Sequence, residues 1–555
     1  MGSEQQDYKL TTKQKGITNV NTPILTFISS NFFDSTIWKI LATSVSIICL
    51  IALNVQAAPI LVTNSDDSGA GSLRQALADA NDGDEISFGV TGTITLTTGE
   101  LLVNKSITIN GPGSDHLTVD GNHASRVFHV AGGVTATIAG LTITNGSASD
   151  WGGGIHNDQS VLTVNNCNIV GNFAPGWGGG IFNDSWTTSA TMRVTNSTIS
   201  GNSVNSIGGG IYSEGSHGIA TLDIVNTTIT GNSAHVGGGF YNSHSTSTVS
   251  NCTISANSAG YGGGGINHVG INGSATLRIT NSTLSGNSAP LGPAIYSYGH
   301  SNTTLDVLDC TLKANWIINV WATLQLGSTI FDTGSIWNES GTINSLGYNL
   351  SSDDAGGFLT ATGDHINTDP MLGPLQDNGG PTFTHELLPN SPAIDAGDPN
   401  FTLPLDYDQR GSDFPRVANG RIDVGAFELQ PTPTPTPTPT PAYAAQVRPP
   451  INADGTSTFN VRRGVVPVRF TLTQGGVATC NLPTATIAVT RTAGGVIGPI
   501  NESVYNGNAD QGSNFRIESC EYVYNLNSRA FGVGTYRVDI LIAGQVVGNA
   551  VFTLN

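Results

Sequence analysis

Ring side chains recur at one position of a Gly-rich repeat, and they are the first residues in this sequence that could bind a ligand. In chain order, the position holds His156, Phe182, Tyr212, Tyr241 and Tyr296, with Asn267 interrupting the series. Phe182, Tyr212 and Tyr241 belong to successive repeats, so we expect their rings to stack. An exposed strip of rings can lie against sugars or a partner surface, whereas a buried stack would only stabilise the fold. These three residues are our candidates for ligand binding.

Catalytic residues are not evident in the sequence. A glycoside hydrolase needs clustered carboxylates that act as acid and base, and a polysaccharide lyase needs calcium ligands and a basic residue. Residues 151–320 contain only Arg193, Arg278 and Lys313 as basic residues. The acidic loops near the end of the repeats could bind calcium, although such loops are usually only solvated; they hold Asp353, Asp354, Asp395, Asp398, Asp406 and Asp408. We predict no catalytic residue, no metal ligand and no cofactor.

Two interleaved repeats indicate the elements that carry the rings. The motif Asn-x-[Thr/Asn]-[Ile/Leu]-x-[Gly/Ala]-Asn begins at Asn166, Asn196, Asn226, Asn251 and Asn281, with a variant at Asp309, so copies start 25 to 30 residues apart. Gly-Gly-Gly-Ile and related markers lie between the copies. The stretches between markers alternate apolar and polar residues, as half-buried strands do. Short strands and Gly turns at this repeat length predict an all-β fold, a right-handed parallel β-helix.

Equivalent residues of neighbouring coils form ladders in a β-helix. The second Asn of each motif copy forms one such ladder, in which Asn tolerates a left-handed turn and its amide can bond to the next amide; these residues are Asn172, Asn202, Asn232, Asn257, Asn287 and Asn315. Arg193 with Asp223 and Arg278 with Asp306 predict outward ion pairs. We expect the ladder cysteines Cys167, Cys252 and Cys310 to be buried thiols.

Composition excludes one class of partner and suggests export. The 555-residue chain carries a net charge of −19, and its few Lys and Arg residues are scattered, so we expect no nucleic-acid binding.

Residues 1–57 resemble a signal peptide: Lys39 precedes an apolar run that ends in Val55-Gln56-Ala57. An uncleaved membrane anchor is the alternative. We expect an extracellular or cell-surface protein with no membrane span in the mature chain.

Changes in the sequence pattern predict the boundaries of further segments and domains. We expect an N-terminal cap and first coils at 58–110, repeats at 111–345, an end segment at 346–430 and a stiff Pro-Thr linker at 431–442. Residues 443–555 contain short strands with turns between them, which predicts an immunoglobulin-like β-sandwich. Cys480 and Cys520 are the only cysteines of this part and could form a disulfide in an exported protein.

Several segments resemble a known family. Ser72-Leu73-Arg74-Gln75-Ala76, the repeats, Ser391-Pro392-Ala393-Ile394-Asp395-Ala396-Gly397 and Asp423-Val424-Gly425-Ala426-Phe427-Glu428 together resemble bacterial variable-anchor ("choice-of-anchor") β-helix proteins, related in repeat style to polymorphic outer-membrane proteins. Residues around Pro467-Val468-Arg469-Phe470 resemble a small extracellular module named for a Pro-x-Lys-Phe sequence, with Arg469 in place of Lys. The resemblance implies surface location and architecture, and it implies no activity.

The first functional hypothesis is a non-catalytic secreted or cell-surface β-helix protein, an adhesin or a stalk that binds carbohydrate or another cell-surface component. The alternative is an extracellular polysaccharide lyase or glycoside hydrolase of the pectin-degrading β-helix type, since that fold hosts such enzymes. A third possibility assigns the binding function to residues 443–555. We expect the protein to be a monomer.

Overall fold

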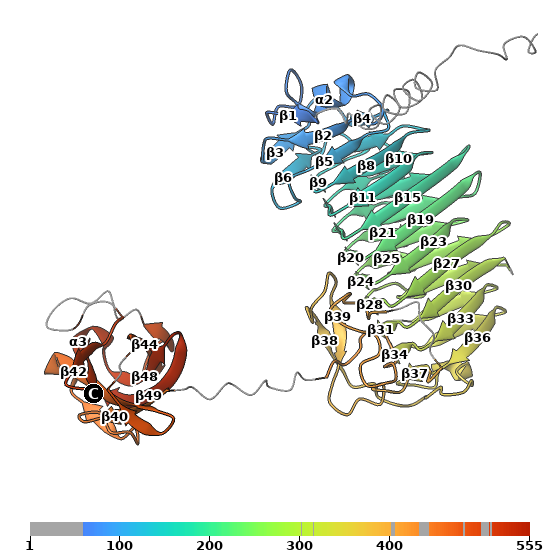
Figure 1. Cartoon of the computed structure of the whole chain (residues 1–555). Helices are drawn as coiled ribbons and strands as arrows, with labels where there is room; N and C mark the ends of the chain where they lie inside the picture. Colours follow the sequence, from blue (N-terminus) through green and yellow to red (C-terminus); the bar gives the residue numbers. More distant parts are fainter. Residues whose placement is uncertain are drawn as a thin grey trace, which may run out of the picture. The chain divides into compact units, whose positions relative to one another are not determined.

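The computed structural model describes residues 59–300, 302–314, 316–400, 406–431, 443–480, 483–500, 510 and 513–555. The expected signal peptide, Asn315 and the linker beyond Pro431 lie outside the described residues. The chain divides into two compact units, Met1–Pro431 and Thr432–Asn555, which Figure 1 shows as an elongated stack of strands and a small β-domain.

The first unit is a right-handed parallel β-helix of about 10 turns. Each turn contributes one strand to each of three long parallel sheets, which we name A, B and C (Figure 1). Sheet A contains β1 (Ile60–Val62), β2 (Glu85–Phe88), β5 (Thr108–Asn110), β8 (Thr135–Ala139), β11 (Val161–Asn165), β15 (Ser189–Thr195), β19 (Ile219–Val225), β23 (Thr246–Ser250), β27 (Ala275–Thr280), β30 (Thr303–Leu308), β33 (Thr323–Gly327) and β36 (Thr342–Gly347).

Sheet B contains β3 (Gly92–Thr95), β6 (Leu117–Asp120), β9 (Thr142–Thr144), β12 (Asn168–Val170), β16 (Thr198–Ser200), β20 (Thr228–Thr230), β24 (Thr253–Ser255), β28 (Thr283–Ser285), β31 (Thr311–Lys313), β34 (Ile330–Asp332) and β37 (Leu350–Ser351). Sheet C contains β4 (Leu101–Val103), β7 (Phe128–Val130), β10 (Ile155–Asp158), β14 (Ile181–Asp184), β18 (Ile211–Glu214), β22 (Phe240–Ser243), β26 (Ile266–Gly270), β29 (Ile295–Gly299), β32 (Ile317–Val320) and β35 (Ile336–Glu339). A short fourth sheet, D, contains β13 (Phe173–Ala174), β17 (Ser203–Val204), β21 (Ser233–Val236) and β25 (Ser258–Gly262).

Apolar ladders form the core of the β-helix. The first residue of each sheet C strand from β10 to β35 points inward and lies in register with its neighbours, and these residues are Ile155, Ile181, Ile211, Phe240, Ile266, Ile295, Ile317 and Ile336. All of them are buried. Because successive side chains of a strand point to opposite faces, the next residue of each strand points outward. The outer face of sheet C therefore carries the residues that follow each Gly marker.

Two kinds of corner residue hold the coils in register. Asn232 is buried and donates from Nδ2 to the Ile199 carbonyl and to Oδ1 of Asn257, at 2.9 and 3.0 Å. The same pattern joins Asn172 to Asn202, Asn202 to Asn232, and Asn257 to Asn287. These ladder residues do not adopt the left-handed conformation that we expected of them. That conformation falls one residue earlier, as at Gly231 (φ 64°), and at the first Asn of each motif, as at Asn226 (φ 50°).

The first unit begins with a cap. The helix α2 (Leu73–Asp79) starts at Ser72, whose side chain accepts a hydrogen bond from the Gln75 amide. Its residues Leu73, Ala76 and Leu77 are buried in the same core as the first coils. The helix thus covers the open end of the apolar core.

The end segment packs against the outer face of sheet B. It contains the hairpin of β38 (Leu372–Gln376) and β39 (Thr384–Leu387), the turn η1 (Ala355–Gly357) and long loops (Figure 1). Buried Gln409 donates to the Cys252 carbonyl at 3.1 Å and accepts from Thr283 at 2.6 Å. Arg410 pairs with Asp408 at 2.6 Å, so Asp408 serves an internal ion pair. Polar side chains of the end segment therefore form hydrogen bonds with buried polar groups of the coils.

The second unit is an immunoglobulin-like β-sandwich of two five-stranded sheets. One sheet contains β40 (Tyr443–Arg448), β42 (Val465–Gln474), β43 (Val477–Thr479), β46 (Arg516–Glu518) and β47 (Glu521–Asn527). The other contains β41 (Ser457–Phe459), β44 (Ala485–Ala493), β45 (Gly498–Ile500), β48 (Gly534–Ile542) and β49 (Gln545–Leu554). The short 3-10 helix η2 (Val461–Arg463) and the short α-helix α3 (Ser528–Phe531) complete it, and Cys480 and Cys520 form a disulfide.

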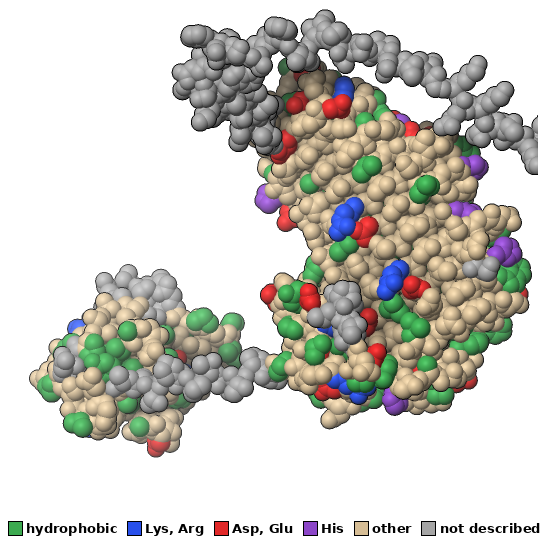
Figure 2. Space-filling model, turned by 45° about the vertical axis from the view of Figure 1, so that its right-hand side comes forward, with side chains coloured by type: hydrophobic (Ala, Val, Ile, Leu, Met, Phe, Trp, Pro, Cys, Tyr) green, Lys and Arg blue, Asp and Glu red, His purple; other side chains and the backbone are tan. Residues whose placement is uncertain are grey.

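Charged side chains are few on the surface of the β-helix, as Figure 2 shows for one face. The expected ion pairs are present: Arg193 contacts Asp223, and Arg278 lies 3.7 Å from Asp306. Cys167, Cys252 and Cys310 are buried free thiols, as expected. In the described part of the chain, no helix is long and apolar enough to cross a membrane.

Candidate functional site

The outer face of sheet C collects most of the aromatic and ionisable side chains that could bind a ligand. One outward ladder runs through ten strands in register: Leu102, His129, His156, Phe182, Tyr212, Tyr241, Asn267, Tyr296, Ile318 and Trp337. The residues two positions later form a second outward ladder, which includes Asp158, Asp184, Glu214 and Glu339. The two ends of this face differ in exposure and in chemistry.

The three rings that we predicted as ligand-binding residues stack but are not exposed. Phe182 and Tyr212 stack at 5.2 Å and are 0% and 4% exposed, and Tyr241 packs edge-on against Tyr212 and is half-buried. Trp177, in the loop before β14, packs edge-on against both Phe182 and Tyr212. Phe182 and Tyr212 are therefore covered, and the three rings form no exposed strip; the stack stabilises neighbouring coils, which is the alternative that the sequence left open.

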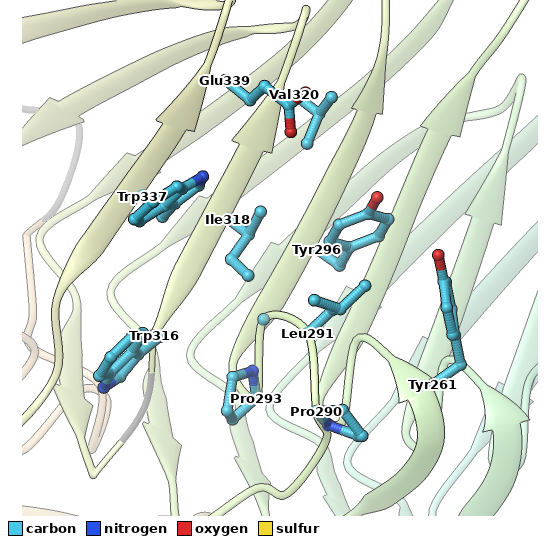
Figure 3. Close-up of a pocket in the computed structure, with 11 residues that line it drawn as sticks. Tyr261, Pro290, Leu291, Pro293, Tyr296, Trp316, Ile318, Val320, Trp337 and Glu339 are labelled. Carbon is cyan, nitrogen blue, oxygen red and sulfur yellow. The ribbon is translucent and has the colours of Figure 1, made fainter.

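An exposed aromatic groove lies further along the same face. Figure 3 shows Tyr261 at one side, Trp316 and Trp337 at the other, and Leu291, Ile318 and Tyr296 between them. The groove has a volume of about 690 Å³, within the range of roughly 300–1,000 Å³ that small-molecule sites occupy. Trp337, Tyr261 and Trp316 are 60%, 50% and 49% exposed. Several exposed rings gathered around one groove mark a candidate binding surface.

Sheet C and its loops position the groove. Tyr296, Ile318 and Trp337 occupy successive rungs of the outward ladder, so Tyr296 and Trp337 lie two rungs apart, about 10 Å at the usual strand spacing. Tyr261 is the second-last residue of β25, the last strand of sheet D, and Trp316 immediately precedes β32. Pro290 and Pro293 lie in the loop between β28 and β29. Glu339 is the only charged residue among those that line the groove.

A histidine–carboxylate cluster lies at the other end of the face, on β7, β10 and β14. His156 Nε2 lies 3.4 Å from Asp184 Oδ2, and His129 Nε2 lies 3.6 Å from Asp158 Oδ2. The two imidazoles stack at 5.1 Å with an interplanar angle of 10°. His129 Nδ1 contacts Glu100 Oε1 at 3.1 Å. His156 and Asp184 are buried, whereas His129 and Asp158 are partly exposed. The cluster is therefore accessible from one side.

Hydrogen bonds and burial set the charges of this cluster. Hydrogen bonds to Asp158 and Glu100 raise the pKa of His129 to about 9, against the cost of burial. The hydrogen bond to His129 lowers the pKa of Asp158 to about 2. Burial lowers the pKa of His156, although Asp184 opposes this shift. Burial and the adjacent Glu214 raise the pKa of Tyr212 well above its usual value, and its hydroxyl donates to Glu214.

Sequence reasoning missed this cluster, although a signal for it existed. The Gly markers are followed by Ile-His156-Asn-Asp158, Ile-Phe182-Asn-Asp184 and Ile-Tyr212-Ser-Glu214. An acidic residue thus recurs two positions after the ring, and strand periodicity places both on the same outward face. His129 and Glu100 lie before the marked repeats, and only the register of β4 and β7 brings them to the cluster.

No protein-family model matches the chain, and no curated protein is significantly similar to it. The β-helix alone does not distinguish a binding protein from an enzyme, since this fold supports both.

Proposed function

We propose that this protein is a secreted or surface-displayed protein that binds a polysaccharide, without cleaving it, in the aromatic groove on the outer face of sheet C. The observation that carries the proposal is the exposure of Tyr261, Trp316 and Trp337 around one groove. The faces of aromatic rings pack well against the apolar C–H faces of sugars, and the polar edges of Trp and Tyr can bond to hydroxyl groups.

The shape and charge of the groove favour an extended, neutral glycan. The rings of Tyr296 and Trp337 lie two rungs apart, a spacing comparable to the length of a disaccharide. No Lys or Arg lines the groove, and Glu339 would repel an acidic chain. A polyuronate such as pectate is therefore a poorer ligand than a neutral glycan.

Export is part of this proposal. The apolar segment that ends at Ala57 supports it, and so does the Cys480–Cys520 disulfide, because disulfides persist mainly in oxidising compartments.

A panel of neutral and acidic polysaccharides in affinity electrophoresis tests the proposal. Trp316→Ala and Trp337→Ala should each weaken the binding of the glycan about five- to thirtyfold, since a ring contact contributes roughly 1–2 kcal/mol. Trp186→Ala is the matched control, because Trp186 is 47% exposed and lies outside the groove. Equal retardation of all three variants, or no retardation of the wild type by any glycan, would overturn the proposal.

Polysaccharide cleavage is the second candidate. One observation favours it: Asp158, Asp184 and Glu214 stand on consecutive coils of the same face, and paired carboxylates are what acid–base cleavage requires. The same panel therefore includes an assay for new reducing or unsaturated ends. Products that form with the wild type and not with Asp184→Asn would replace the binding proposal with an enzymatic one.

A further inference from the structure

The histidine–carboxylate cluster has a geometry that the aromatic groove does not explain. From this geometry we infer that His156, Asp158 and Asp184 bind a divalent transition-metal ion of the Zn²⁺ type, which joins two consecutive coils of the β-helix. The inference concerns strands β10 and β14, and it is independent of the proposed polysaccharide binding.

The distances fit ligands of a shared ion. Two ligands that each lie 2.0–2.1 Å from a tetrahedral Zn²⁺ are about 3.3 Å apart. His156 Nε2 and Asp184 Oδ2 are 3.4 Å apart, longer than a strong hydrogen bond between such groups. One donor atom from each of His156, Asp158 and Asp184 lies within 4.8 Å of the other two. A small inward movement of these side chains would bring them around one ion.

The carboxylates are oriented for this role. Asp184 Oδ1 accepts from the Trp186 amide at 2.9 Å, and Asp158 Oδ1 accepts from Gln159 Nε2 at 2.8 Å. Each carboxylate therefore directs its other oxygen, Oδ2, toward a histidine. Among the described residues, neither carboxylate pairs with a Lys or Arg, because nearby Arg126 is engaged by Glu100 and Asp150. Within this described part of the chain, Asp184 therefore has no charged partner other than His156, and a metal ion would offset its charge.

The imidazoles supply the second line of evidence. His156 is more than nine-tenths buried, with one ring nitrogen directed at Asp184 and the other without a hydrogen-bond partner. His129 stacks on His156 at 5.1 Å, and its Nδ1 is held by Glu100 at 3.1 Å, so it helps to hold the His156 ring in place. A nitrogen donor favours Zn²⁺, Co²⁺ or Ni²⁺ over Ca²⁺, which takes six to eight oxygens.

Titration of the metal-free full-length protein with Co²⁺ and Zn²⁺ tests the inference. We expect one Co²⁺ per chain, with the intense visible absorption of a tetrahedral site, displaced by Zn²⁺ and not by Ca²⁺. His156→Gln and Asp158→Asn should each weaken binding at least tenfold. His235→Gln is the control, because His235 is exposed on another coil.

The Asp158→Asn variant separates a loss of metal binding from misfolding. Asp158 is partly exposed, and its replacement leaves the buried His156 in place. Its circular dichroism should match that of the wild type. Absence of saturable Co²⁺ binding, equal affinity in the Asp158→Asn and His235→Gln variants, or tighter binding of Ca²⁺ than of Zn²⁺ would each overturn the inference.

Discussion

At the scale of single residues, the buried Asn ladder stabilises the stacking of the coils. Asn232 donates to Ile199 and Asn257, and its Oδ1 accepts from the amide and the side chain of Asn202, each at 2.9 Å. Asn232→Ala would leave several buried groups without partners, each costing about 1–3 kcal/mol. We therefore expect the variant to lower the free energy of unfolding of the β-helix by about 2–5 kcal/mol, measured by denaturant unfolding.

Asn302→Ala is the control for this prediction, because Asn302 lies exposed in the turn before β30. Its effect should stay within about 0.5 kcal/mol. If the two variants are equally stable, the amide ladder does not hold the coils together.

Single residues also show what the sequence could and could not predict. Repeat position alone identified the ladder from Asn172 to Asn287, because identical residues on stacked coils must meet. Repeat position also predicted that Phe182 and Tyr212 stack. It did not predict that Trp177 covers them, because the path of the loop before β14 depends on tertiary packing. Exposure, unlike register, is not encoded in the repeat.

At the scale of the coil, the glycines Gly231 and Gly209 are required for different physical reasons, and this difference can be tested. Gly231 has a φ of 64°, and a Cβ there would have its nearest neighbour 3.9 Å away. Ala256 and Ala314 occupy the same repeat position with φ of 53° and 54°. Gly209 lacks a positive φ, but a Cβ there would come within 3.0 Å of the carbonyl oxygens of Gly238 and Ser233.

Gly209→Ala should therefore destabilise the β-helix far more than Gly231→Ala. The Gly231 variant has only the left-handed conformation to accommodate, at a cost of about 1–2 kcal/mol. In the Gly209 variant the new Cβ must push two coils apart. We therefore expect a clearly lower melting temperature than in the Gly231 variant, measured from the β-sheet circular dichroism signal during heating. A larger loss in the Gly231 variant would show that backbone conformation, and not coil spacing, requires the glycines.

Coils that keep the repeat were predictable, and coils that lose it carry the aromatic groove. The Gly marker is intact before β26 but becomes Gly-Pro-Ala before β29, and β32 to β35 spans only 19 residues between the paired Ile317 and Ile336. Trp316 and Trp337 lie in coils that lack the Gly marker, although Trp337 keeps the outward ladder position of Tyr296. The groove could not be inferred from the repeats because it is formed where they degenerate.

At the scale of the whole molecule, the two units have different means of stabilisation. The β-helix has its ladders and three free buried thiols, whereas the sandwich has a disulfide that closes a segment of 40 residues. Cross-linking a loop of that length stabilises a fold by about 4 kcal/mol when the cost falls on the unfolded chain. Reduction of this disulfide should therefore lower the stability of the sandwich and leave that of the β-helix unchanged.

Differential scanning calorimetry of the full-length protein should show two transitions, because the chain separates into two units with separate hydrophobic cores. A reductant, or the Cys480→Ser variant, should lower only one of them, by well over 5 °C for a domain of this size. Cys252→Ser is the matched control for the β-helix, where a buried thiol is lost without breaking a bond. If reduction moves both transitions together, the units unfold cooperatively, and the sandwich takes part in the stability of the coils.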